Sequence, residues 1–189
     1  LHRLWEVDQV VKKCVSSFNF HLMFTTLLNF CSNDLSAFYF DIRKDVIYCD
    51  NITSQTRRSS RTLLNIIFNY LVRWFAPSIS FTTEEAWKAM GNDKSIHLED
   101  FLSCEKKYEN NEISEKWTVV KNIRKVATGA IEKIREDKII RSSLEAHLEI
   151  YVSQEIFKKI QDVSINEIAI TSSFKLNIID QKSSGFELE

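Results

Sequence analysis

The stretch from Ser54 to Trp87 constrains the fold more than any other part of the chain. Its apolar residues recur at steps of three and four, as on one side of a helix. These residues are Leu63, Leu64, Ile67, Leu71, Trp74 and Phe75. The opposite side is a polar stripe made of Arg58, Arg61, Asn65, Asn69 and Arg73. Pro77 lacks a backbone N–H and disfavours a helical residue before it, so we expect this helix to end at Ala76. The helix would bury one side and present cations on the other.

A second helix is expected directly after this proline. Thr82 is followed three residues later by Glu85, which is the spacing of a capping box at a helix start. The helix contains Trp87 and can end at Gly91, because glycine tolerates the left-handed backbone of a helix C-terminus. Trp74 and Trp87 both fall on apolar stripes, so we interpret them as core residues rather than as ligand-stacking residues.

The residues before Ser54 predict two helices. The first helix includes Leu1 and has no N-terminal capping residue before it, which indicates that the chain is part of a longer protein. An apolar series then runs from Phe20 to Tyr48 and favours one continuous helix. Asp34 would lie near its apolar stripe and would need a partner there. The alternative is that Asp34 caps the start of a separate helix. A short connection over Cys49–Thr53 follows.

After residue 97 the pattern changes twice. The segment His97–Asn111 is acidic and irregular, with a short helix expected near Leu98–Phe101. Ser114 is expected to cap a long helix whose apolar positions run from Trp117 to Ile134. Alternating residues then predict a strand over 144–152. A short helix over 155–160 and further strands over 165–170 and 174–179 complete a small mixed unit.

The predicted fold class is mainly α, with an antiparallel helical bundle followed by a small mixed α/β subdomain. Three Gly and one Pro in 189 residues favour long helices over a turn-rich β fold. We expect the bundle over 1–112, a long connecting helix over 113–141 and the α/β part over 142–181. Residues 182–189 are expected to be a disordered tail or a cloning remnant.

Charge is segregated along the chain although the formal net charge is only −1. Residues 1–76 and 121–141 are basic, whereas 77–120 and 142–189 are acidic. A polyanionic partner is therefore compatible with this sequence, and solvated helix faces are the alternative explanation. The four cysteines are widely spaced without a CxxC pair, and no secretory signal or membrane-length apolar run is present. We expect reduced thiols and a cytoplasmic location, with neither membrane nor DNA as a partner.

No catalytic or metal-binding pattern stands out. The sequence lacks a GxxxxGK[ST] loop, a GxGxxG loop after a strand and an HExxH helix. Its four histidines have no paired metal-ligand spacing, and the pairs Ser59-Ser60 and Ser142-Ser143 have no local histidine arrangement to activate them. We therefore predict no catalytic residue, no metal site and no cofactor in this chain.

The remaining candidate function is binding, and the residues suited to it cluster at the connection between two predicted helices. Arg57, Arg58 and Arg61 open the central helix, while Arg43 and Lys44 lie near the end of the preceding one. A helical hairpin would bring these five cations together beside an aromatic residue, Tyr48. Cations for phosphates and aromatic planes for unpaired bases are how single-stranded RNA loops are recognised. The alternative is an internal network with Asp41, Asp45 and Asp50. Further candidate RNA-binding cations are Lys121, Arg124, Lys125 and Arg141.

Three blocks carry a resemblance to a known family. They are NFCSNDLSAFYFDIRKDVIYCD (29–50), RRSSRTLLNIIFNYLVRWFAPSISFTTEEAW (57–87) and DKIIRSSLEAHLEIY (137–151). Each is similar to the helical anticodon-binding region of bacterial isoleucyl-tRNA synthetases, and the resemblance extends over nearly the whole chain. The third block distinguishes that family from the valyl and leucyl enzymes, which share the helical domain.

This resemblance implies a class I synthetase that joins isoleucine to its tRNA with ATP and magnesium. The catalytic module would lie upstream, so the present chain would bind the anticodon stem-loop of tRNA(Ile) and catalyse nothing alone. The family commonly has glycine where Arg141 stands, so the local turn is expected to differ. Many bacterial members also end in a four-cysteine zinc module, which these cysteines do not match. The alternatives are a valyl or leucyl synthetase domain and a helical protein–protein interaction module.

Overall fold

The computed structural model describes residues 1–179. Backbone contacts divide the chain into two compact units, the first comprising Leu1–Glu109 and the second beginning at Asn110. The described part is mainly helical and contains one two-stranded sheet, which confirms the predicted combination of a helical bundle with a small α/β part. The expected tail over 182–189, and residues 180–181 before it, lie outside the described residues.

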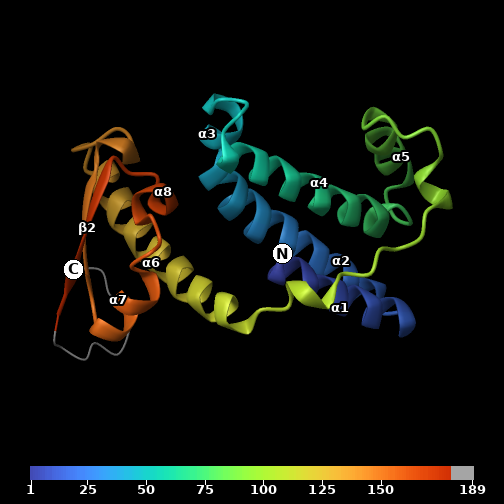
Figure 1. Cartoon of the computed structure of the whole chain (residues 1–189), viewed down its shortest axis with the longest axis horizontal. Coiled ribbons are helices and arrows are strands. Elements are labelled where there is room, and N and C mark those ends of the chain that lie inside the picture. Colours follow the sequence, from blue (N-terminus) through green and yellow to red (C-terminus); the bar gives the residue numbers. More distant parts are fainter. Residues whose placement is uncertain (180–189) are drawn as a thin grey trace. The chain divides into compact units, whose positions relative to one another are not determined.

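The first unit is built from helices (Figure 1). Its α-helices are α1 (His2–Ser16), α2 (Phe20–Asn29), α3 (Asp41–Cys49), α4 (Gln55–Phe75) and α5 (Ser80–Ala89). A π-helical segment, η1 (Phe30–Phe40), joins α2 to α3, and 3₁₀ turns follow at η2 (Ile96–Leu98) and η3 (Lys106–Tyr108). The short helix expected near Leu98–Phe101 is therefore placed slightly earlier, at η2.

One continuous helix runs from Phe20 to Cys49, as the sequence predicted. Figure 1 shows it as an unbroken rod through α2 and α3. Its eleven-residue π-helical middle was not predicted. Asp34 lies in that middle and does not begin a new helix. Its Oδ2 accepts a hydrogen bond from Arg3 Nε at 2.8 Å, which gives the carboxylate the partner it needs beside the apolar stripe.

The core of the first unit lies between α1, α2 and α4. Its fully buried members include Leu4, Val7, Val11, Met23, Leu27 and Trp74. The segment after α5 closes over this core through Cys104 and its neighbours. Asp8, also buried, accepts a hydrogen bond from the Cys104 backbone N–H at 3.1 Å and pairs with Lys12 at 2.6 Å. A buried carboxylate thus ties the returning segment to α1.

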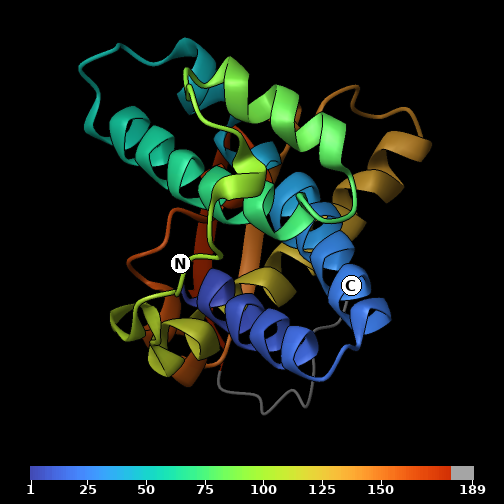
Figure 2. The same ribbon diagram turned by 90° about the vertical axis from the view of Figure 1, so that its right-hand side faces the viewer.

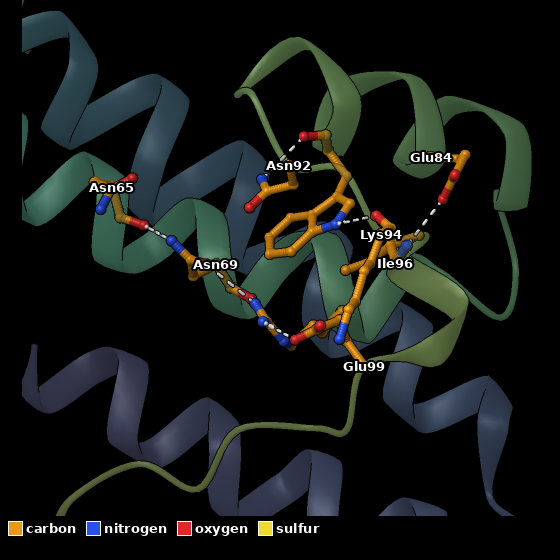
Figure 3. Close-up of polar contacts among 9 residues, drawn as sticks. Asn65, Asn69, Glu84, Asn92, Lys94, Ile96 and Glu99 are labelled. Carbon is orange, nitrogen blue, oxygen red and sulfur yellow. Dashed lines mark hydrogen bonds and ion pairs between the residues drawn. The ribbon is translucent and has the colours of Figure 1, made fainter.

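The end of α4 differs from the expected polar stripe at one residue. The helix stops at Phe75 with Ala76 as its cap, as the proline predicted. Arg73, however, is 7% exposed and not part of a presented cationic side. Its Nη2 donates to Glu99 Oε2 at 2.8 Å, and its guanidinium lies 4.7 Å from the Trp87 ring centroid. Figure 3 follows this chain of contacts from Asn69 to Glu99. The returning loop covers the arginine.

Helix α5 begins earlier than the capping box predicted. Its N-cap is Ile79 without a side-chain cap bond, so Thr82 lies inside the helix. The carboxylate that reaches a backbone N–H is Glu84, which accepts from Ile96 N at 2.9 Å (Figure 3). It also accepts from Ser95 Oγ at 2.8 Å. The predicted end of the helix is confirmed, because Gly91 adopts a left-handed φ of 86°.

The second unit packs a long helix with a small parallel sheet. Its elements are α6 (Asn111–Glu136), η4 (Ser143–Glu145), β1 (His147–Val152), α7 (Gln154–Ile160), α8 (Ile165–Ala169) and β2 (Ser173–Ile178). The strands pair in parallel from His147 with Ser173 to Val152 with Ile178. Their connection through α7 and α8 is the helical crossover that a parallel pair requires.

Two sequence predictions for this unit were wrong. The side-chain cap of α6 is Asn110, whose Oδ1 accepts from Ile113 N at 2.9 Å, so Ser114 lies inside the helix. The strand predicted over 165–170 is the helix α8. Ile165 and Ile168 are both buried there at helical spacing, and that spacing competes with an alternating pattern in so short a segment. The first strand also begins at His147, after the 3₁₀ turn η4.

Candidate nucleic-acid interface

The turn between α3 and α4, residues 50–54, is the centre of the candidate interface. Asn51 Oδ1 accepts from the backbone N–H of Thr53 at 2.9 Å and from its hydroxyl at 2.8 Å. The Ser54 hydroxyl donates to Asp50 Oδ2 at 2.8 Å and accepts from the Arg57 backbone N–H at 3.4 Å, which caps α4. Side chains therefore hold this turn in place through local hydrogen bonds.

Arg57 is directed into the turn. Its Nη1 donates to the Asp50 backbone oxygen at 2.6 Å, and its Nε is buried without a hydrogen-bond partner among the described residues. Of the possible internal acceptors weighed from the sequence, Asp50 is thus the residue used, through its backbone rather than its carboxylate. Asp50 is the residue that follows the last turn of α3, so the Arg57 guanidinium lies near a helix end that carries partial negative charge.

The aromatic candidate and an apolar neighbour are exposed next to this turn. Tyr48 is 81% exposed and Ile52 is 75% exposed. Lys44 pairs with Asp41 at 3.0 Å on the surface of α3, and Arg43 is half-buried on the same helix. Figures 1 and 2 show the turn projecting from the end of the two helices it joins. Helices α3 and α4 contact each other, so these residues share one end of the first unit.

Arg58 and Arg61 are the exposed cations of α4. Within residues 1–179, neither side chain has an ion-pair partner. Arg58 and Thr62 also line a shallow hollow of about 330 Å³, together with Leu1 at the start of the chain. This side of α4 can therefore receive an anionic ligand without first breaking an internal pair.

The remaining four cations lie on the second unit. Lys121 and Lys125 are exposed on α6, whereas Arg124 is half-buried. The backbone N–H of Arg141 donates to Glu145 Oε2 at 3.0 Å. A left-handed φ of 59° occurs at Lys138 rather than at Arg141, so the bend after α6 does not require glycine at position 141.

Sequence reasoning named Asp50 only as a possible acidic partner of the arginines and did not identify Asn51 and Ser54 as side chains that hold the turn. Asp50, Asn51 and Ser54 form its hydrogen bonds, and Ile52 is exposed at its apex. The run Asp-Asn-Ile-Thr-Ser carried a usable signal, because Asn and Ser commonly bond their own backbone in turns and at helix starts. A search for charged side chains alone does not find Asn51 and Ser54, which are uncharged.

The described residues include no group of three His, Cys, Asp or Glu side chains placed to hold a metal ion. Cys14, Cys31, Cys49 and Cys104 are free thiols. Burial raises the pKa of Cys31 and of Cys104, which lowers the thiolate fraction that a nucleophile needs. Across the described part of the chain, no helix is long and apolar enough to cross a membrane.

Comparison with known proteins identifies relatives of this chain. Relatives include the isoleucine–tRNA ligases of Pelagibacter ubique, 46% identical over 92% of this chain, and Bartonella henselae, 40% identical over 93%. The isoleucine–tRNA ligase of Agrobacterium fabrum is 38% identical over 100% of this chain. The aligned regions are 19%, 18% and 20% of these relatives, so the chain spans about a fifth of their length.

A family model matches most of the chain as well. It describes the anticodon-binding domain of tRNA ligase and covers residues 1–152, which include all of the first unit, α6 and β1. This match covers most of the chain and agrees with its fold class, so the chain belongs to the anticodon-binding domain family of tRNA ligases.

Proposed function

We propose that this chain is the anticodon-binding part of an isoleucine–tRNA ligase and holds the anticodon stem-loop of tRNA(Ile). The similarity to isoleucine–tRNA ligases over nearly the whole chain carries this proposal. It favours isoleucine over valine or leucine as the amino acid of the parent enzyme, and it disfavours a protein–protein interaction module.

The parent enzyme would charge tRNA(Ile) with isoleucine in the cytoplasm. ATP and magnesium would act in a catalytic module of the same protein, outside this chain. The catalytic module is then a partner of this chain, and the chain alone would not aminoacylate tRNA. The bundle over 1–112 would be the main tRNA-binding part, and the helix over 113–141 would connect it to the α/β part over 142–181.

The proposed contacts divide into three kinds. Exposed cations meet phosphates, an exposed aromatic stacks on an unpaired base, and cations on the second unit extend the contact along the RNA. The residues proposed to make or to support these contacts are Arg43, Lys44, Tyr48, Arg57, Arg58, Arg61, Lys121, Arg124, Lys125 and Arg141. Free guanidinium groups on α4 and the exposed ring of Tyr48 support this assignment most directly.

A competition experiment tests where on the tRNA this chain binds. A labelled tRNA(Ile) transcript is bound to the 189-residue chain at low salt and displaced with one of two RNA hairpins. The anticodon stem-loop is expected to compete, whereas a hairpin of the acceptor stem is expected to compete weakly. Equal competition by the two hairpins would contradict recognition of the anticodon arm.

A further inference from the structure

Three residues form a closed set of contacts across the turn between α3 and α4. Arg57 donates from Nη1 to the Asp50 backbone oxygen at 2.6 Å. Asp50 accepts from the Ser54 hydroxyl at 2.8 Å, and that hydroxyl accepts from the Arg57 backbone N–H at 3.4 Å. The end of α3 and the start of α4 are thus linked through one guanidinium, one carboxylate and one hydroxyl.

The Arg57 guanidinium is poorly placed to serve as a phosphate clamp. Its Nε is buried, which removes the fork formed by Nε and Nη2, and Nη1 already donates to a carbonyl, which ties the other fork to the turn. If the Arg57 guanidinium left the Asp50 carbonyl to bind phosphate, the C-terminal end of α3 would also lose a nearby cation, and cations are favoured at that end of a helix. Arg58 and Arg61, on the next positions of α4, are exposed and carry no such commitment within the described residues.

We propose that Arg57 is a positioning residue that acts through Tyr48 and does not contact RNA itself. By fixing the Asp50 carbonyl, it sets the direction in which the chain leaves α3 and holds the turn that flanks the exposed ring of Tyr48. Arg58 and Arg61 then supply the phosphate contacts of this hairpin end. This inference rests on the proposed function and refines it by giving Arg57 a different role from Arg58 and Arg61.

The salt dependence of binding separates a positioning arginine from a phosphate-binding one. Each lost phosphate contact lowers the slope of log affinity against log salt by about 0.7 to 0.9, because fewer counterions are released. Arg57→Gln is therefore expected to weaken binding of the anticodon stem-loop by about fivefold with an unchanged slope. Arg61→Gln removes the same charge from the same helix and is the matched control, for which the slope is expected to fall.

Ser54→Ala tests the same contact set without changing any charge. It removes the hydroxyl that joins Asp50 to the start of α4, so binding should weaken while the slope stays constant. In a double-mutant cycle, Arg57→Gln and Tyr48→Ala should be less than additive, because both remove the same stacked base contact. Additive losses, or a lower slope for Arg57→Gln, would overturn the positioning role.

Hydrogen exchange in the free protein provides a readout that needs no RNA. Arg57→Gln is expected to speed exchange of the Ser54 backbone N–H, which bonds to Asn51 O at 2.9 Å, by about tenfold or more. Arg61→Gln should leave this rate unchanged. Unchanged exchange in Arg57→Gln would refute the proposal even if RNA binding were lost. Absence of RNA binding by the unaltered chain would instead count against the proposed function, and the exchange result would still decide whether Arg57 holds the turn.

Discussion

A buried arginine holds the loop after α5 against the end of α4. Arg73 donates to Asn69 O and Asn69 Oδ1 at 3.0 Å each and to Glu99 at 2.8 Å, while Trp87 covers its guanidinium. The Arg73 side chain is only 8% exposed, so its charge depends on these partners. Helical periodicity placed Arg73 on the polar stripe and gave no sign that a distant loop would cover it.

Removing the partner of this arginine should destabilise the protein. Glu99→Ala leaves a buried cation without its carboxylate and is expected to cost about 2 kcal/mol of unfolding free energy. Glu105→Ala, which breaks an exposed pair with Lys107 in the same segment, is the control and should have no measurable effect. Chemical denaturation of the three proteins measures both values. Equal stability of the two variants would show that the Arg73 pair contributes nothing.

Glu84 connects α5 to the same loop and makes stability depend on pH. Hydrogen bonds from Ser95 and from the Ile96 backbone hold the pKa of this carboxyl below its usual value. A carboxyl with a lowered pKa in the folded state stabilises the fold above its unfolded-state pKa. That stabilisation is lost as the pH falls through the lowered folded-state pKa.

Glu84→Gln should therefore be less stable than the unaltered protein at neutral pH. The difference is expected to shrink as the pH falls through the lowered pKa of Glu84, because the carboxyl itself becomes protonated there. Denaturation curves at several pH values measure this difference in unfolding free energy. Glu85→Gln is the control for the loss of one neighbouring charge. A difference that stays constant, or grows in acid, would contradict this role.

Helix existence was predictable and helix boundaries were less so. The apolar series from Phe20 to Tyr48 predicted one helix because its period persists, but the π-helical middle depends on backbone bonds that side-chain periodicity does not reveal. Helices α5 and α6 each start before the expected cap, at Ser80 and Asn111. Several residues near the N-terminus of each helix are able to cap it, and tertiary contacts decide which residue does so. Glu84, for example, bonds to a loop rather than to its own helix.

The end of α5 provides a prediction at the scale of one helix. Gly91 has a φ of 86°, and an added Cβ would meet nothing within 4 Å. Gly91→Ala should therefore cost about 1 kcal/mol of unfolding free energy through backbone conformation alone. Gly91→Asn should cost less, because asparagine tolerates the left-handed region better. Denaturation midpoints measure the order, and an alanine variant as stable as the glycine protein would contradict it.

At the scale of the molecule, charge and periodicity predicted a helical unit with a cationic hairpin end. They also predicted the exposed aromatic there, because Tyr48 lies on the polar part of its helix. They did not assign different roles to Arg57, Arg58 and Arg61, which differ only in how the turn folds around them. The grouping of α6 with the small sheet depends on contacts between distant segments, which local patterns do not specify.

The measurement that tests the account most directly is a fluorescence-anisotropy titration of the chain at low and moderate salt. It compares three RNAs, namely a tRNA(Ile) transcript, the same transcript with a changed anticodon and an unrelated tRNA. We expect the unaltered transcript to bind about tenfold or more tightly than the other two, with affinity falling steeply as salt rises. Equal affinity for all three RNAs, or no binding at any salt, would contradict anticodon recognition by this chain.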